Sequence, residues 1–253
     1  MSMSDDNGYV YSEDELALFK DGFARKRPGL VRSLEKRLTS IRRRFCRYSG
    51  RIRARIAEYP LAIAAMGTLP AGSRIAEIGG ASSLLGLNLV CLGHEVHVID
   101  LRPCPLKHPK LFSRQVNFFE SGLEDSQFDG VTCISVIEHV GIERYNGPRI
   151  EGGDFKMMAE ISRICRPGGL VVLSAPYGRG HDPTGGVKPR GYRVYNRDRL
   201  SRLLAGFSVE SLRFFSMTNG AWIEAEQASA DLTPTARPPK TVFVARLRVE
   251  KGN

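Results

Sequence analysis

The sequence predicts an α/β fold in which a doubly wound, mostly parallel sheet carries helices on both faces. Apolar strand-like runs alternate with helix-like segments along the chain, which is typical of such a sheet. A tight turn at Gly79-Gly80 follows the first run, and Asp100 ends the second. In a doubly wound sheet, small residues after the first strand and a carboxylate after the second form the first half of a nucleotide-cofactor site.

The expected elements follow from apolar periodicity and from the turn residues between them. The helix before Pro167 ends at residues 165–166, because proline cannot continue a helix. Gly168-Gly169 then turns the chain into a continuous apolar run, which is typical of a buried parallel strand. We expect strands at residues 74–78, 95–100, 112–117, 129–135, 170–176, 207–217 and 241–249, and helices at residues 83–92, 154–166 and 196–205.

The turn after the first strand argues against a dinucleotide. A hydride-transfer enzyme would need G-x-G-x-x-G, whose third glycine allows close helix-to-strand packing. The three positions hold Gly79, Ala81 and Leu84, and leucine is too bulky for that packing. Glu77, two residues before the first glycine, suits instead a ligand that carries a cationic sulfonium and an amino group.

This turn resembles motif I of the class I S-adenosylmethionine-dependent methyltransferases, Asp/Glu-x-Gly-x-Gly-x-Gly. Glu77 and Gly79 match the motif, and the small residues Ala81 and Ser83 occupy its later glycine positions.

Two later strings extend the resemblance. Residues 128–140, in which Asp129 opens a buried strand, resemble the fourth-strand motif of the same superfamily, and residues 166–176 resemble its turn and fifth strand. The resemblance implies a seven-stranded, mostly parallel sheet with an antiparallel last strand, paired with the strand before it at the sheet edge. Residues 138–146 and 190–196 loosely resemble a bacterial subgroup found with polysaccharide or secondary-metabolite genes.

The resemblance also implies which residues bind S-adenosyl-L-methionine. Asp100 would take the ribose hydroxyls, and Leu101 would flank the adenine. Asn117 stands where the family often has an acid that binds the adenine amino group, and Ser135 would offer its backbone to the amino acid portion of the cofactor. The residues expected around the methionine portion are Glu77, Gly79, Gly80 and Ala81.

Methyl transfer to a hydroxyl needs mainly positioning, helped by a general base. His139 follows the fourth strand, and His181 and Asp182 follow the fifth, so each is a candidate base, although each also has a purely structural interpretation. Asp154 opens a helix, and an N-cap role explains it without chemistry. Groups suited to carbohydrate or phosphate recognition, Tyr192, Arg193 and Tyr195, either bind the acceptor or brace their loop.

Composition agrees with one catalytic domain and an extension. The chain has no run of eighteen apolar residues, and its acidic start lacks the features of a signal peptide, so we expect a cytoplasmic protein. The five cysteines are scattered and never at C-x-x-C spacing, which implies neither a disulfide framework nor a metal site.

Residues 25–55 carry thirteen Lys or Arg against the single acid Glu35. Apolar residues recur there at helical spacing, which predicts a basic amphipathic helix, or two helices bent near Gly50, within an extension of residues 1–60. Three interpretations stay open. The helix packs on the domain of residues 61–253 or on a second subunit in a homodimer, lies on the anionic inner face of a membrane, or binds nucleic acid.

The sequence thus favours a methyltransferase that acts by in-line displacement on an oxygen of a sugar, glycolipid or other small molecule. One alternative is an RNA methyltransferase that uses the basic helix, although the chain lacks the Asn/Asp-Pro-Pro-Tyr signature of amino-group methylation on bases. The other is a non-catalytic scaffold or membrane-associated module, which Ala81 and Ser83 in motif I keep open.

Overall fold

A computed structural model describes residues 54–143, 148–182, 191–234 and 240–250 of the chain. The chain divides into two units, residues 1–51 and residues 52–253. The first unit lies outside the described residues. The basic amphipathic helix expected within residues 25–55 therefore stays a prediction.

The described residues form one eight-stranded sheet with the strand order β3-β2-β1-β4-β5-β8-β6-β7. The first five strands are parallel, and the last three are antiparallel to their neighbours. They are β1 (Arg74–Ile78), β2 (Glu95–Asp100), β3 (Leu111–Gln115), β4 (Phe128–Ile134), β5 (Cys165–Pro176), β6 (Phe207–Thr218), β7 (Ala221–Ala225) and β8 (Thr241–Val249).

The mostly parallel sheet with an antiparallel last strand is confirmed, with two differences in detail. β8 lies between β5 and β6 rather than at the edge, and the edge strand is the additional β7. Asn219 and Gly220, both with positive φ, turn β6 back into β7. This Asn-Gly pair is a common signal for a two-residue hairpin, but the strand that follows it is short and weakly apolar.

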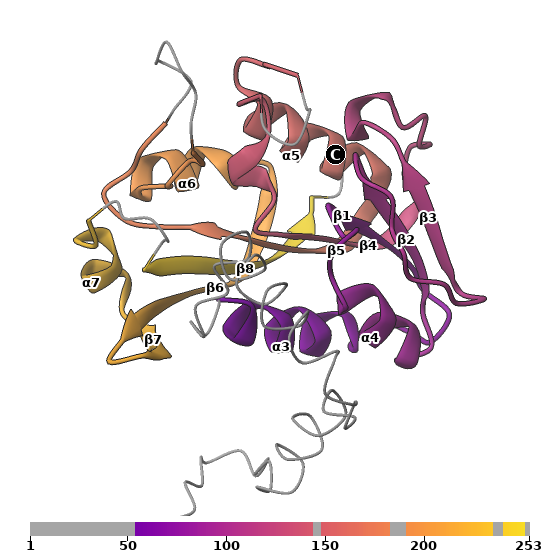
Figure 1. The fold of residues 1–253 in the computed structure, drawn as a ribbon, viewed down its shortest axis with the longest axis horizontal. Helices are drawn as coiled ribbons and strands as arrows, with labels where there is room; N and C mark the ends of the chain where they lie inside the picture. Colours follow the sequence, from indigo (N-terminus) through magenta and orange to yellow (C-terminus); the bar gives the residue numbers. More distant parts are fainter. Residues whose placement is uncertain (1–53, 144–147, 183–190, 235–239, 251–253) are drawn as a thin grey trace, which may run out of the picture. The chain divides into compact units, whose positions relative to one another are not determined.

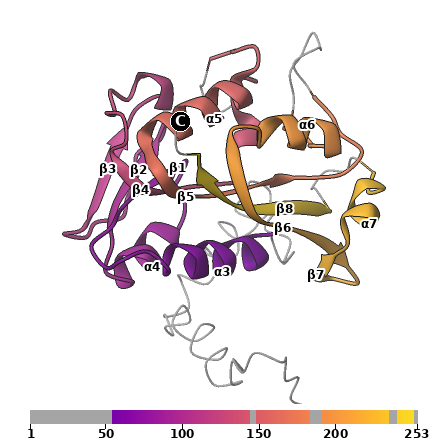
Figure 2. The same ribbon diagram turned by 180° about the vertical axis from the view of Figure 1, so that it is seen from behind.

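Helices cover both faces of the sheet (Figures 1 and 2). Helices α3 and α4 lie on one face, α5 and α6 lie on the other, and α7 lies near β7. Two buried apolar clusters, one on each face, form the core. The helices are α3 (Arg55–Met66), α4 (Leu85–Cys91), α5 (Gly153–Ile164), α6 (Arg197–Leu203) and α7 (Gln227–Asp231), and two short 3-10 turns are η1 (Phe118–Glu120) and η2 (Ile137–His139).

Helix α3 begins within the residues that the sequence analysis assigned to the N-terminal extension. Residues 55–60, assigned from the sequence to the N-terminal extension, form its first half. Ala62 and Met66 on the same helix are fully buried against the sheet, in a cluster with Ile75 of β1. The structural unit that contains the sheet therefore begins before residue 60, because this helix completes one face of the core.

Candidate cofactor and acceptor site

A cavity of about 270 Å³ lies at the carboxyl ends of β1, β2 and β4. β1 is flanked by β2 on one side and β4 on the other, so the chain reverses its direction of travel across the sheet at this point. Ligands of open α/β sheets bind at such a switch point. The position alone makes this cavity the candidate site.

The turn after β1 forms one wall of the cavity. Gly79 has φ +72°, and a Cβ there would lie only 2.4 Å from Val136 Cγ2. Glycine is thus needed where this turn meets the loop after β4. Gly79, which the sequence analysis names as a cofactor residue, lines the cavity. Ser82, which the sequence analysis does not name, lines it as well.

Glu77 and its neighbours support this turn from behind. The Glu77 side chain is buried and is absent from the cavity wall. A Cβ on Gly80 would come within 2.5 Å of its carboxyl carbon, and one on Gly86 within 2.6 Å of Oε2. Burial raises the pKa of Glu77 to about 7. The structure therefore places Glu77 and Gly80 beneath the turn rather than at the cavity surface, where the sequence predicted them.

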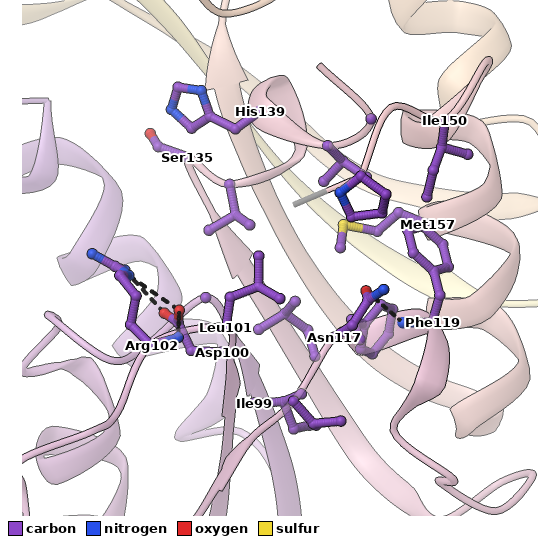
Figure 3. A pocket seen from close by; sticks show the side chains of 18 of the residues that line it. Ile99, Asp100, Leu101, Arg102, Asn117, Phe119, Ser135, His139, Ile150 and Met157 are labelled. Atoms are coloured by element: carbon purple, nitrogen blue, oxygen red, sulfur yellow. Dashed lines mark hydrogen bonds and ion pairs between the residues drawn. The ribbon is translucent and has the colours of Figure 1, made fainter. Parts of the chain in front are cut away.

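Asp100 is the charged centre of the cavity wall (Figure 3). Its Oδ1 accepts the Arg102 backbone N–H at 2.9 Å, and its Oδ2 accepts the Ala81 N–H at 3.0 Å. The Arg102 guanidinium donates to both oxygens, at 3.1 and 3.0 Å. Burial acts to raise the pKa of Asp100, but these hydrogen bonds outweigh it and hold the pKa below its usual range. Ala81 is buried and positions Asp100 instead of lining the cavity.

The opposite side of the cavity is mostly apolar. Figure 3 shows Asn117 and Phe119 facing Asp100 and Arg102 across it, with Met157 above them. Asn117 Oδ1 accepts the Phe119 N–H at 3.3 Å and its Nδ2 donates to Glu120 at 3.2 Å, so the side chain caps η1. Asn117 and Leu101, the two residues expected near the adenine, line the cavity together with Ile99, Val116, Phe118 and Phe119.

The end of the cavity toward helix α3 is polar. The sequence predicted only some of the residues that form this end. Arg55 lines the cavity there, and so does Ser135, which the sequence predicted. Arg55 pairs with the fully buried Glu58. The signal for this end was an acidic residue on a helix face that is otherwise apolar, since Glu58 precedes the buried Ala62 and Ala65 by one and two turns.

Of the three candidate bases, His139 reaches the cavity. It ends η2, directly after β4, and its imidazole Nε2 lies 3.7 Å from Glu138 Oε1. The Tyr192 ring meets the imidazole edge-on, with the ring centroids 6.2 Å apart. The structure thus brings Tyr192 and His139 together, as a pair at one rim of the site.

His181 and Asp182 are absent from the cavity wall. The backbone of His181 pairs with that of Val194, at 2.8 and 2.9 Å. The Asp182 carboxylate lies 2.7 Å from Arg199 Nη1 and 3.4 Å from Arg193 Nε. These two candidates therefore hold the segment after β5 in place, and their predicted catalytic role is not supported by their positions.

Arg193 and Tyr195 are fully buried, in contrast to their predicted role in acceptor binding. Arg193 donates to the Val140 carbonyl oxygen, and the Tyr195 hydroxyl donates to Asp154 Oδ2 at 3.2 Å. Burial raises the pKa of Tyr195 well above its ordinary value. Both residues brace the loops: Arg193 holds Val140 and lies beside the Asp154 and Asp182 carboxylates, and Tyr195 is bonded to Asp154.

Asp154 binds both Tyr195 and Arg199 and does not cap a helix. It is fully buried and accepts two hydrogen bonds from Arg199, each at 3.0 Å. The N-cap of α5 is Gly152, in the left-handed conformation. Asp154, Asp182, Arg193, Tyr195 and Arg199 are called the buried ionic cluster below.

Within the described ranges, no group of three or more His, Cys, Asp or Glu side chains is arranged to hold a metal ion. Cys91, Cys104, Cys133 and Cys165 are free thiols there, and Cys46 lies outside those ranges. The helices that the structure describes include none long and apolar enough to cross a membrane.

The model of a family described as "Caenorhabditis protein of unknown function, DUF268" matches residues 113–247. Over 122 residues the chain is 30% identical to the ubiquinone biosynthesis O-methyltransferase of Xanthomonas axonopodis pv. citri. This match covers 43% of the chain and 51% of the relative, so the chain spans about half the length of the curated relatives it matches.

Solved structures of methyltransferases share the fold. The 1,6-didemethyltoxoflavin-N1-methyltransferase of Burkholderia thailandensis, with bound S-adenosylhomocysteine, superposes with a TM-score of 0.57 at 15% identity, over 99% of this chain and 95% of that one. The N-methyltransferase NodS of Bradyrhizobium japonicum WM9, also with S-adenosylhomocysteine, gives a TM-score of 0.53 at 12% identity, over 76% and 86%. The chain thus has the Rossmann-like fold of class I methyltransferases.

Proposed function

The chain belongs to the family described as "Caenorhabditis protein of unknown function, DUF268", and we propose that it is an S-adenosylmethionine-dependent methyltransferase. The observation that carries the proposal is the division of the cavity into a polar and an apolar end. Arg55, Gly79 and Ser135 form the polar end, which suits the charged methionine portion of the cofactor, and Leu101 and the apolar residues around Phe119 form a slot that suits adenine.

The residues present fit this cofactor. A cofactor can reach the backbone of Gly79, because that residue lines the cavity. Asp100 is a carboxylate at neutral pH and stands at the end of β2, where a ribose would lie. The ribose hydroxyls would share the Asp100 oxygens with Arg102, or move its guanidinium aside.

We propose that His139 is the general base. The cofactor, when bound, supplies a methyl group carried on a sulfonium. The His139 imidazole would take the proton of the acceptor hydroxyl as the methyl carbon leaves the cofactor sulfur for the acceptor oxygen, with the demethylated thioether as the leaving group. The Glu138 carboxylate, 3.7 Å from the imidazole Nε2, would favour the imidazolium that results. Tyr192 packs on the imidazole and limits its rotation. The apolar side chains Val136 and Val140 help to exclude water from the cavity.

The proposed acceptor is a hydroxyl of a small molecule, with sugars and glycolipids among the candidates. A base at the cavity favours an oxygen acceptor over a more nucleophilic amine, and the curated relatives named O-methyltransferases support the same choice. Arg193 and Tyr195, on which the carbohydrate interpretation rested, are buried. Tyr192 is the remaining member of that group near the site.

Calorimetry with S-adenosylmethionine tests the cofactor assignment. We expect the full chain to bind it, and Asp100→Ala to bind about 10- to 100-fold more weakly, since a hydrogen bond to a charged group is lost. Asp198→Ala, which removes an exposed carboxylate from α6, is the matched control and should bind normally. If the full chain does not bind the cofactor, or if Asp100→Ala binds it equally well, the proposal is wrong.

The acceptor can then be identified by its label. The protein is incubated with methyl-labelled cofactor and with fractions of small molecules, lipids and RNA from cells. We expect label in the small-molecule or lipid fraction, on an ether oxygen. Label in RNA alone would favour the alternative methyltransferase.

A further inference from the structure

Glu58 joins helix α3 to two strands beneath the cavity, although it is itself absent from the cavity wall. Its side chain is fully buried. Oε1 accepts hydrogen bonds from Ser135 Oγ at 2.6 Å and Ser174 Oγ at 2.8 Å, and Oε2 accepts one from Arg55 Nη1 at 2.6 Å. All three partners come from different elements: the end of β4, β5 and the start of α3.

Packing alone does not require a carboxylate at this position. Buried ion pairs are often replaced by apolar residues of similar volume without loss of stability. The neighbouring positions on the buried face of α3, Ala62 and Met66, show that apolar residues fit against this sheet. The carboxylate of Glu58 is therefore better explained by what it holds in place.

Two of its three partners line the cavity. Arg55 stands at the polar end with its side chain about one-third exposed, and Ser135 lies next to it in the wall. Ser135 has φ +48°, a left-handed conformation that non-glycine residues rarely adopt. Its N–H donates to the Ser174 carbonyl oxygen at 3.0 Å, which holds the start of the loop after β4 against β5.

We propose that Glu58 is a positioning residue of the cofactor site, which fixes the Arg55 guanidinium and the Ser135 turn so that Arg55 binds the carboxylate of the cofactor's methionine portion. This inference rests on the proposed function. An unrestrained arginine loses much rotational freedom when it binds a ligand. Arg55 is already held by Glu58, so less of that freedom remains to be lost. Its other guanidinium nitrogens keep donors for a carboxylate, which a guanidinium can bind through two parallel hydrogen bonds.

The test compares two probes that differ in the amino acid portion. S-adenosylhomocysteine carries the carboxylate, whereas 5′-methylthioadenosine lacks the whole amino acid portion but keeps the ribose and adenine. Dissociation constants of both are measured by calorimetry on the full chain and on Glu58→Gln, which keeps the shape of the side chain and removes its charge. We expect Glu58→Gln to bind S-adenosylhomocysteine about 10- to 100-fold more weakly and methylthioadenosine unchanged.

Controls separate positioning from folding. Glu124→Gln removes an exposed carboxylate that does not line the cavity, and it should bind both probes normally. Should Glu58→Gln fail to fold, Glu58→Asp keeps the charge and withdraws it by one methylene, and the same selective loss is expected. In a double variant with Arg55→Met, the Glu58 substitution should cause little further loss of S-adenosylhomocysteine binding.

Equal weakening of both probes, or no weakening of either, would overturn the positioning role. Additive losses in the double variant would also overturn it, because Glu58 would then act independently of Arg55. If the unmodified chain binds neither probe, the proposed function itself is wrong. If it binds both, and Glu58→Gln shows no selectivity, only this inference fails.

Discussion

At the carboxyl ends of β1, β2 and β4, charged and polar side chains face the cavity, whereas after β5 they face one another. Asp100 and Arg102 pair at the cavity surface. In the buried ionic cluster, Asp154 and Arg193 are fully enclosed by protein. Residues of the same chemistry thus line an open cavity in one region and hold loops in place in the other.

The difference arises from what stands opposite each side chain. The Asp100 carboxylate opens onto a space bounded mainly by apolar groups and small residues, so a ligand can supply further partners. Asp154 meets Arg199 and Tyr195, whose donors already satisfy it. A buried carboxylate with complete partners holds structure in place, and one with an open side can bind.

The largest expected effect is on the methyl-transfer rate, and it distinguishes His139 from His181, both of which the sequence analysis names as candidate bases. His139→Gln should lower the methyl-transfer rate by about 10²- to 10⁴-fold, because the base is lost. Its affinity for S-adenosylhomocysteine should be unchanged, as calorimetry can check. His181→Gln is the matched control and should keep nearly full activity, since His181 contributes its backbone, rather than a cavity-lining side chain, to the fold.

The opposite pattern would reverse the comparison. If His181→Gln abolished transfer and His139→Gln did not, the reacting acceptor would have to lie against the segment after β5. The rim formed by His139 and Tyr192 would then be structural.

A second prediction tests the buried ionic cluster by stability. Asp154→Asn should lower the free energy of unfolding by about 3 to 5 kcal/mol, because it breaks a fully buried pair and leaves guanidinium charge from Arg193 and Arg199 poorly compensated. Urea unfolding measures the change. Glu224→Gln, which breaks an exposed ion pair with Arg213, should lose less than about 1 kcal/mol. A loss below about 1 kcal/mol in Asp154→Asn would contradict the structural role.

The same comparison explains how far the sequence could predict this molecule. β1 and β2 have the bounds that the sequence predicted, because each is an apolar run with turn residues at both ends. Gly79, Asp100 and Leu101, which the sequence analysis names as cofactor-binding residues, all line the cavity, since strand ends in a parallel sheet meet at one edge. Their contact with a cofactor stays a prediction.

The sequence did not predict correctly which charged side chains face the cavity and which face one another. The carboxylates beside Arg193 are Asp154 of α5 and Asp182 of the segment after β5, and nothing in local spacing indicates that they meet. Arg55 and Glu58 were missed for a related reason. Both precede the recognisable motifs, and Arg55 reaches the cavity only through the packing of α3 on the sheet.

The smallest expected effect is the contribution of Glu77 to the pH dependence of stability. Glu77 is a buried carboxyl beneath the turn that borders the cavity. Its folded-state pKa is raised to about 7 by burial, above the ordinary value near 4.5. Between these two pH values the folded state therefore binds more protons than the unfolded state. The free energy of unfolding should fall as pH rises from about 4.5 to 7, by up to about 3 kcal/mol.

Glu77→Gln should remove that part of the pH dependence, because an amide does not titrate, so the variant should be more stable than the natural chain above pH 7. Urea unfolding of both proteins at several pH values gives the difference between them. Glu95→Gln is the comparison: hydrogen bonding to His97 lowers the pKa of Glu95, so the stability that Glu95 contributes is present above about pH 4.5 and is lost as the pH falls below it. This variant should therefore be less stable than the natural chain by a constant amount above about pH 4.5, and the slope of its pH profile should differ only below that value. Parallel pH profiles for the natural chain and Glu77→Gln would mean that Glu77 is charged and solvated beside the cavity. In that case it would belong with Asp100 rather than with the buried acids such as Asp154.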